Sequence, residues 1–176
     1  TPSILGAAWN QWFFWDGRKD SLWSQALAPL EDPKEHNLAR TDLAKFVLTD
    51  PNYSEKYQTI FGPELPSNEA IQAWPTDARP SGSIEQIKAW KALSEQQRQN
   101  IDKTFANVGK SLAAYVSTLQ PPSSRFDHYV STLKAGKTDV QFSETELAGL
   151  RLFIDPNNQC LNCHAGALFS NQSFHS

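Results

Sequence analysis

The stretch SEQQRQNIDKTFANVGKSLAAYVSTL, residues 94–119, decides the fold class of this chain. Ser94 and Gln97 have the spacing of a capping box, in which two side chains satisfy free amides at the start of a helix. Apolar residues then recur mostly at steps of three and four, at Ile101, Phe105, Val108, Leu112, Tyr115, Val116 and Leu119. This period predicts one long helix with a single buried stripe, ended by Pro121-Pro122.

Shorter helical patterns flank this stretch on both sides. Before it we predict loops over 31–37 and 75–83, and helices over 21–28 (stopped by Pro29), 41–48 (capped by Thr41 or Asp42), 50–62 (opened by Asp50-Pro51) and 68–74. After it we predict a helix over 124–134 and another that begins at a second capping box, Ser143 with Glu146, and ends near Asp155-Pro156. No segment alternates apolar and polar residues for long enough to predict a sheet, so the chain is predicted to be mostly α.

A five-residue motif, Cys160-Leu161-Asn162-Cys163-His164, follows the last predicted helix and contains both cysteines of the chain. The pattern Cys-x-x-Cys-His is the attachment sequence of c-type haem, in which the two thiols bond to the two vinyl groups of one porphyrin. The adjacent His164 is then placed to ligate the iron from one face. The pentad therefore predicts covalently bound haem c, and with it a redox protein.

Other uses of a Cys-x-x-Cys pair fit this sequence less well. A zinc site needs four ligands, and no second cysteine pair supplies them. A dithiol redox pair normally follows a strand of a βαβ unit, a pattern that we do not find here. An ordinary disulfide across two intervening residues is a rare structural device. Because a histidine follows the pair directly, haem attachment is the preferred interpretation.

The second axial ligand of this haem is not evident. The chain contains no methionine, the common second ligand of electron-carrying c haems, so it cannot complete a His/Met site alone. We interpret the remaining histidines, His36, His128 and His175, as surface or structural residues. His175 also follows His164 too closely in the sequence to reach easily over to the opposite haem face.

The bulk composition is that of a globular protein and disfavours some function classes. With 176 residues the chain can form one domain or two small ones. Its net charge of -3 gives no indication of nucleic-acid binding, and no apolar run approaches the length of a membrane span. No signal peptide is visible. Because haem is usually attached to this pentad outside the cytoplasm, we predict a periplasmic location for a mature form.

Two further groups of residues accompany the pentad. The first runs Phe14-Trp15-Asp16-Gly17-Arg18, Ser21-Leu22, Gln25-Ala26, Pro29-Leu30 and Pro33-Lys34-Glu35. The second comprises Glu146, Gly149, Leu152-Phe153, the pentad itself, Gly166, Phe169 and Phe174-His175. In this order they resemble the bacterial di-haem cytochrome c peroxidase family, which includes the MauG-type enzymes. The resemblance spans nearly the whole chain.

This resemblance implies a cytochrome c-like haem domain within a two-domain dihaem architecture. Family members carry two pentads and this chain has one, so the first is expected upstream of Thr1 and the second axial ligand downstream of Ser176. We expect residues 1–140 to form the inter-haem and helical region with distal-pocket residues. Residues 141–176 would begin the C-terminal haem segment, which is incomplete. Calcium is a further family cofactor, but its ligands draw on residues outside this window, so none is assigned.

The resemblance also implies roles for individual residues. Cys160, Cys163 and His164 would hold the electron-transfer haem. Trp15 matches the tryptophan between the two haems, where an indole can mediate electron transfer. Taken without the family, Trp15 is more simply a core residue.

Two polar residues match the peroxide pocket of the family. Glu35 matches the acid–base glutamate, since a carboxylate in a dry pocket can take a proton from one peroxide oxygen and return it to the other. Gln25 matches an amide that could hydrogen-bond peroxide. Their plainer interpretation is as solvated polar residues, and Glu31 and Asp32 are rivals for the role of Glu35. Separately, Asp16 and Arg18 are expected to form an ion pair or to support a haem propionate.

Three functions follow from these assignments. The leading hypothesis is reduction of hydrogen peroxide to water with electrons from a small redox protein, a cytochrome c or a cupredoxin, with the C-terminal haem as the relay. The alternative is a MauG-type enzyme that oxidises Trp or Tyr side chains of a protein substrate. A third hypothesis, a non-enzymatic c-type electron carrier, fits the single pentad but has no need of Trp15, Gln25 and Glu35. By analogy with the family, a homodimer is possible.

Overall fold

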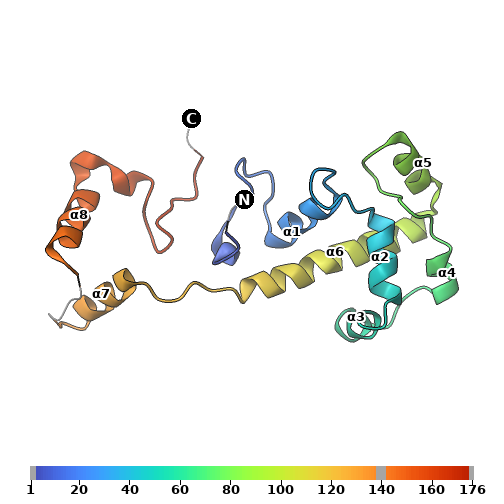
Figure 1. Cartoon of the computed structure of the whole chain (residues 1–176), viewed down its shortest axis with the longest axis horizontal. Coiled ribbons are helices and arrows are strands. Elements are labelled where there is room, and N and C mark those ends of the chain that lie inside the picture. The colour runs from blue at the N-terminus through green and yellow to red at the C-terminus, as the bar shows by residue number, and fades with distance from the viewer. Residues whose placement is uncertain (1–2, 138–141, 175–176) are drawn as a thin grey trace. The chain divides into compact units, whose positions relative to one another are not determined.

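The computed structural model describes residues 3–137 and 142–174, which fold into helices joined by loops (Figure 1). The α-helices are α1 (Leu22–Glu31), α2 (Arg40–Thr49), α3 (Ser54–Phe61), α4 (Asn68–Gln72), α5 (Ile84–Ala92), α6 (Glu95–Ser117), α7 (Arg125–Lys134) and α8 (Glu144–Ile154). Three 3-10 helices add η1 (Ala7–Trp9), η2 (Pro156–Asn158) and η3 (Cys160–Asn162). Among the described residues the only strand-like feature is an isolated bridge between Phe13 and Lys19. The predicted mostly α class is confirmed.

The described chain divides into two compact units, each considered by itself below. The long-helix unit, residues 12–118, contains α1 to α6. The pentad unit combines residues 3–11 with the residues from 119 onward and contains η1, α7, α8, η2 and η3. The boundaries of these units differ from the boundary expected at residue 140. That boundary separates the haem segments of a family member and not compact units, so it stays a prediction. Within the described residues, no helix combines the length and apolarity needed to cross a lipid bilayer.

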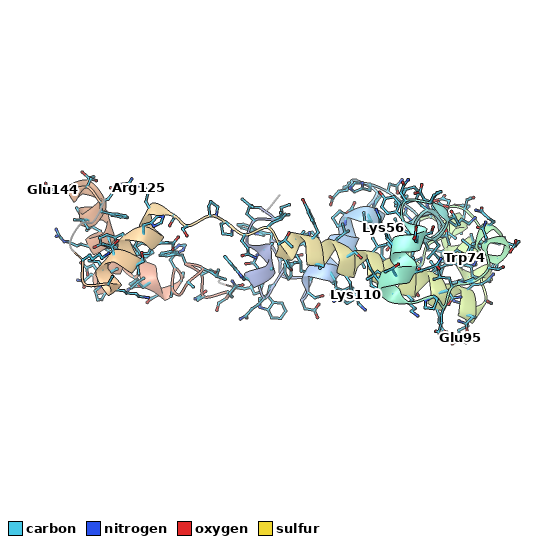
Figure 2. All side chains as sticks on the ribbon, turned by 90° about the horizontal axis from the view of Figure 1, so that it is seen from below. Lys56, Trp74, Glu95, Lys110, Arg125 and Glu144 are labelled. Carbon is cyan, nitrogen blue, oxygen red and sulfur yellow. The ribbon has the colours of Figure 1, made fainter. Side chains whose placement is uncertain are left out.

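Helix α1 packs on α6, and the core of the long-helix unit forms where α2 packs on α6 and where α3, α4 and α5 gather around them (Figure 1). Its buried members are Ala44, Leu48, Tyr57, Ile71, Trp74, Ala78, Trp90, Leu93 and Ile101. Figure 2 shows Trp74 within this dense group of side chains. Because these residues come from five helices and the loops between them, burial of their apolar surface holds the short helices in place.

Helix α6 follows the sequence prediction at its start and departs from it near its end. The capping box of Ser94 and Gln97 is present, and Ile101 and Phe105 are buried. Leu112 and Tyr115, predicted to lie on the same buried stripe, are instead 37% and 62% exposed. The periodicity predicts which face of the helix is apolar, but burial needs a neighbouring element, and the described residues leave these two side chains open to solvent.

Helix α1 does not stop at Pro29 as predicted, but continues through it to Glu31. Proline removes one amide donor and so interrupts only one bond of the helical ladder in the last turn. The following loop compensates, because the amide of His36 donates to the Pro29 carbonyl and the amide of Leu38 donates to the Leu30 carbonyl. The end of α1 is thus joined firmly to the loop that follows it.

Two predicted helix starts were wrong. Helix α2 is preceded by Ala39, whose side chain cannot cap it, and Thr41 lies inside the first turn. The buried Thr41 hydroxyl instead donates to the carbonyl of Ala78 and accepts from its amide, both at 3.0 Å. Helix α3 begins only at Ser54. A hydrogen-bonded turn that closes on the Asp50 carbonyl precedes it. In both cases a polar side chain that could cap a helix makes a different contact.

Helix α5 was not predicted, although the sequence contains its signal. Ser83 accepts from the amide of Gln86, and the Gln86 side chain accepts from the amide of Ser83. This is the same capping box that was recognised at Ser94 and Ser143. The turn-rich residues before it hid the pattern, and the predicted loop over 75–83 leads directly into it.

Arg40 of α2 ties α1 and α6 together. Its Nε and Nη2 atoms bind the Glu31 carboxylate at 3.0 and 2.6 Å, and its Nη1 binds Asp102 Oδ1 at 2.7 Å. The guanidinium also lies 4.5 Å from the centroid of the Phe105 ring. Burial disfavours the charge of Arg40, but the hydrogen bonds that it donates to Glu31 and Asp102 outweigh this effect and raise the pKa of Arg40. The three helices therefore meet at one charged side chain.

Gly109 is the point of closest approach between α1 and α6. A Cβ atom at this position would lie 2.7 Å from the Trp23 carbonyl oxygen and 2.7 Å from Leu27 Cγ. Backbone atoms cannot yield to such a contact by rotating a side chain. Glycine is therefore required here by packing and not by its backbone conformation.

We predict that Gly109→Ala destabilises the long-helix unit. Alanine favours a helix over glycine by about 0.5–1 kcal/mol, but the overlap with α1 costs about 1–3 kcal/mol, so a net loss of about 1–2 kcal/mol is expected. Urea unfolding followed by circular dichroism measures the change. Lys110→Ala is the control, because Lys110 is an exposed neighbour on α6 (Figure 2), and its replacement should change stability by less than about 0.5 kcal/mol. An unchanged or raised midpoint for Gly109→Ala would contradict the close packing.

Candidate functional site

Helix α8 leads into the pentad, and both of its ends are fixed by side chains. At its start the predicted capping box is confirmed, with Glu146 accepting from the Ser143 amide at 2.8 Å and Ser143 accepting from the Glu146 amide at 3.2 Å. Arg125, at the start of α7, pairs with the same carboxylate at 2.7 and 3.1 Å. Figure 2 labels Arg125 and, beside the cap of α8, Glu144. At the other end, the Asp155 side chain accepts from the amide of Asn157 and begins η2.

The pentad forms one short helical turn. Gln159, with a φ of 57°, turns the chain into η3, and the amide of His164 donates to the Cys160 carbonyl at 2.9 Å. Cys160 and Cys163 are three positions apart on this turn, and His164 follows directly. Both cysteines are free thiols in the structure. The turn therefore carries both thiols and the imidazole within five residues.

The imidazole of His164 is oriented by a backbone carbonyl. Its Nδ1 atom lies 3.1 Å from the Phe169 carbonyl oxygen. A carbonyl can only accept a hydrogen bond, so Nδ1 is the donor in this contact, and in the neutral ring Nε2 then keeps its lone pair. A backbone partner on one ring nitrogen is the usual way in which a protein prepares the other nitrogen for a metal.

Four phenylalanines form an apolar face beside the pentad. Their rings contact one another in series, with centroid distances of 6.3 Å for Phe142–Phe126, 5.4 Å for Phe126–Phe169 and 6.0 Å for Phe169–Phe153. Together with Leu150 and Gly149 of α8 they line an open, almost wholly apolar hollow. The Phe153 ring also lies 6.3 Å from the His164 ring. Such a face suits a large, flat, apolar ligand.

These residues fit haem c. Two free thiols at the required spacing, an imidazole with a free Nε2 and an adjacent aromatic face are the groups that the cofactor needs. Among the described residues, no group of three or more His, Cys, Asp or Glu side chains could hold a metal ion, so they offer no complete ligand set for zinc. Of the other histidines, His36 and His128 are exposed as predicted, and His175 lies outside the described residues.

The three residues assigned to peroxide chemistry lie on successive segments of the long-helix unit. Trp15, in the turn before α1, is 97% exposed, so its plainer interpretation as a core residue is wrong. Gln25 is half-buried on α1, and Glu35 is exposed in the loop after α1. A dry pocket was expected around Glu35, but the residues of its own loop do not enclose the side chain. No hydrogen bond joins the three side chains within the part of the chain that the structure describes.

The turn that contains Trp15 is stabilised by the predicted ion pair. Arg18 Nη1 lies 2.8 Å from Asp16 Oδ1, and the Arg18 guanidinium lies 3.7 Å from the centroid of the Phe14 ring. The hydrogen bond from the Arg18 side chain is the main reason that the pKa of Asp16 is lowered. Both charged side chains are exposed, so the pair shapes the turn and adds little to global stability.

The two rivals of Glu35 are engaged in structural contacts. Glu31 binds Arg40 through both carboxylate oxygens. Asp32 Oδ1 accepts from the Lys34 amide at 2.8 Å and shapes the turn. The Glu35 carboxylate makes no hydrogen bond or ion pair with any described residue.

Sequence analysis missed one residue next to this loop, Arg79. Its side chain is buried and donates to the Glu31 carbonyl at 2.7 Å and to Asn37 Oδ1 at 3.0 Å. Arg79 lies in the predicted loop over 75–83, and a single arginine among turn-forming residues carries no pattern that predicts burial. Only the tertiary structure brings it to the end of α1.

Comparison with known proteins agrees with the predicted resemblance. A model of the di-haem cytochrome c peroxidase family matches residues 1–135. The chain is 30% identical over 176 residues to the methylamine utilization protein MauG of Methylophilus methylotrophus, and the match covers 99% of this chain and 40% of that protein. It is 24% identical over 173 residues to the cytochrome c551 peroxidase of Nitrosomonas europaea, and this match covers 98% of this chain and 39% of that protein.

The chain therefore belongs to the di-haem cytochrome c peroxidase family. A further relative, the cytochrome c551 peroxidase of Pseudomonas aeruginosa, is 24% identical over 174 residues, and the match covers 99% of this chain and 38% of that protein. The chain thus spans about two fifths of the length of these relatives. The family implies a cytochrome c-like haem domain with haem c as its cofactor, in agreement with the helical fold and with the residues around the pentad.

We predict that the capping carboxylate of Glu146 makes the stability of the pentad unit dependent on pH. Hydrogen bonds from the Ser143 amide and hydroxyl, and then from Arg125, lower the pKa of Glu146 from its ordinary value of 4.5. Because the folded-state pKa is the lower one, this stabilisation is complete above about pH 4.5 and is lost as the pH falls through the lowered value.

Glu146→Gln should therefore weaken the unit at neutral pH and flatten its loss of stability between about pH 5 and pH 3, measured by thermal unfolding. Glu144→Gln is the matched control, since Glu144 lies exposed in the first turn of the same helix and should keep the wild-type slope. Equal acid slopes for Glu146→Gln and wild type would contradict the role of the carboxylate.

Proposed function

We propose that this chain supplies the inter-haem region and the C-terminal haem segment of an enzyme that reduces hydrogen peroxide to water. Two electrons and two protons convert one peroxide into two waters, and a small redox protein would provide the electrons. Haem c, when bound, supplies an iron that accepts and passes single electrons. Cys160, Cys163 and His164 would hold the relay haem, and residues outside this chain would hold the peroxide-reacting haem.

Glu35 is the proposed acid–base group. Splitting the O–O bond requires a proton to leave the oxygen that meets the iron and to reach the departing oxygen. The single observation that carries this assignment is the difference between Glu35 and its rivals. Glu31 and Asp32 have structural partners, whereas the Glu35 carboxylate is free of contacts with the described residues. A carboxylate without structural partners can turn toward a substrate and carry a proton to it.

Gln25 and Trp15 are proposed to assist Glu35. The Gln25 amide could donate a hydrogen bond to peroxide and hold it for proton transfer. The indole of Trp15 is almost fully exposed in the long-helix unit, which leaves its ring free to approach a cofactor or a partner. An aromatic ring with that freedom suits the proposed role in electron transfer between haems.

The partners and location follow from the same proposal. The electron donor would be a cytochrome c or a cupredoxin, and the enzyme would be periplasmic, because haem is usually attached to its pentad outside the cytoplasm. A homodimer is proposed by analogy with the family only. Calcium stays a possible cofactor without an assigned ligand in this chain.

A second candidate function is oxidation of Trp or Tyr side chains in a protein substrate. It is favoured by the 30% identity to a relative named MauG and by the exposure of Trp15. The two candidates share the pentad and the residues near α1, and they differ in the final source of electrons. A third, the non-enzymatic electron carrier, would need only the pentad.

We predict that Glu35→Gln lowers kcat/KM for peroxide by roughly 10²–10⁴-fold, the usual contribution of a general acid–base group. Stopped-flow mixing of the haem-loaded protein with peroxide measures the rate. Asp32→Asn is the matched control, because asparagine retains an oxygen that can accept from the Lys34 amide, and it should react at close to the wild-type rate. A normal rate for Glu35→Gln, or an equal loss for Asp32→Asn, would count against the assignment.

Haem content and donor turnover separate the three functions. Intact mass under denaturing conditions should show two covalent haems on the complete protein if it is a dihaem enzyme, and one if it is a carrier. Rapid turnover of peroxide with reduced cytochrome c supports the peroxidase. Negligible turnover with that donor, together with oxidation of a protein substrate, would replace the leading proposal by the MauG-type activity.

A further inference from the structure

The Glu35 loop, residues 32–37, is folded around a single residue. The Asp32 carbonyl accepts from the amides of Glu35 at 3.0 Å and Asn37 at 2.9 Å, and Asp32 Oδ1 accepts from the amide of Lys34 at 2.8 Å. These bonds give the loop its internal shape. Outside the loop, the amide of His36 donates to the Pro29 carbonyl and ties the loop to the last turn of α1 at one point.

Arg79 binds the loop at both of its ends. Its Nη1 atom donates to the carbonyl of Glu31, immediately before the loop, and its Nη2 atom donates to Oδ1 of Asn37, the last residue of the loop. The guanidinium is planar and rigid, so two bonds from one fork set the direction of the loop as well as its position. Arg79 is 5% exposed, and water therefore competes little for these bonds.

Arg79 is itself held by its surroundings. Its Nε atom donates to Gln86 Oε1 at 3.1 Å, and Gln86 Nε2 donates to Asp77 Oδ1 at 2.7 Å. The preceding residue, Ala78, is fixed to Thr41 by two hydrogen bonds. Gly82 lies so close that a Cβ atom there would collide with Gln86 Oε1 and would lie 2.6 Å from Arg79 Nε. The fork thus connects the Glu35 loop to the start of α2 and α5.

The partners of this buried cation are unusual in kind. The three acceptors are a backbone carbonyl and two side-chain amides, and no ion pair to Arg79 occurs among the described residues. Burial of a guanidinium without a carboxylate is costly, and apolar residues of similar size often give a more stable protein at such sites. Stability alone therefore does not account for an arginine here, whereas the directed fork does.

We propose that Arg79 is a positioning residue that directs the Glu35 loop, and thereby the Glu35 carboxylate, toward the peroxide site. This inference rests on the proposed role of Glu35. Displacement of a reacting group by about 1 Å can lower a rate by roughly 10²-fold, so a side chain that touches no substrate can still govern the chemistry.

The test is a double-mutant cycle in the haem-loaded protein with Arg79→Gln, Glu35→Gln and the combined variant. Arg79→Gln should react with peroxide roughly 10–10²-fold more slowly than wild type. If Arg79 acts through Glu35, the combined variant should be no slower than Glu35→Gln alone. Arg98→Gln is the matched control, because Arg98 donates to the carbonyl of Leu93 at 2.6 Å and makes no bond to the Glu35 loop. It should react at the wild-type rate.

Amide hydrogen exchange provides a readout that does not depend on activity. In Arg79→Gln the amides of Glu35, Asn37 and Leu38 should exchange at least about tenfold faster, and in Arg98→Gln they should be unchanged. If Arg79→Gln fails to fold, Asn37→Gly replaces it. Glycine tolerates the φ of 50° at that position and deletes the acceptor of Nη2, so the same amides should exchange faster and the peroxide rate should fall.

The outcomes separate this inference from the proposed function. Suppose that Glu35→Gln reacts slowly and that Arg79→Gln lowers the peroxide rate further, by the same factor, in the combined variant. The positioning role is then wrong and the role of Glu35 stands. Unchanged exchange in the loop also overturns the positioning role. If Glu35→Gln reacts normally, the proposed acid–base role fails, and the exchange rates still decide whether Arg79 directs the loop.

Discussion

The Arg40 guanidinium is the interaction on which the long-helix unit depends most. From α2 it reaches Glu31 at the end of α1 and Asp102 on α6, and it lies over the Phe105 ring. Apolar burial brings helices together but leaves them free to slide and rotate, whereas a bidentate pair has one geometry. Because Glu31 is the last residue of α1, Arg40 also determines where the loop after α1 begins. Any site built on that loop therefore depends on this side chain for the position at which the loop starts.

Local signals were sufficient to predict helix α8 and the pentad that follows it. The capping box of Ser143 and Glu146, the proline that ends α8 and the Cys-x-x-Cys-His spacing all act within a few residues. The structure adds the carbonyl of Phe169, which orients His164 from only five positions away. The proposed haem attachment site can be predicted from sequence because its two thiols and imidazole lie within five consecutive residues.

The long-helix unit could be predicted only in part, because its decisive contacts join distant segments. The period of α6 predicted its apolar face but not that Leu112 and Tyr115 would be exposed among the described residues. Thr41 has the chemistry of a cap, yet a residue 37 positions away, Ala78, takes its hydroxyl. Gly109 carries no sequence signal of its own, and only the approach of α1 explains why it must be glycine.

The two parts of the candidate site should therefore respond differently to sequence change. The contacts around the pentad come from the neighbouring residues 125–169, so haem attachment would depend mainly on that one segment. The direction of the Glu35 loop depends instead on Arg40 and Arg79, which lie in other segments and have no role in chemistry themselves. Relatives could keep the pentad and Glu35 and yet differ in activity if these two arginines differ. Within this family, the ability to bind haem c is thus a weaker indicator of peroxide chemistry than the supports of the loop after α1.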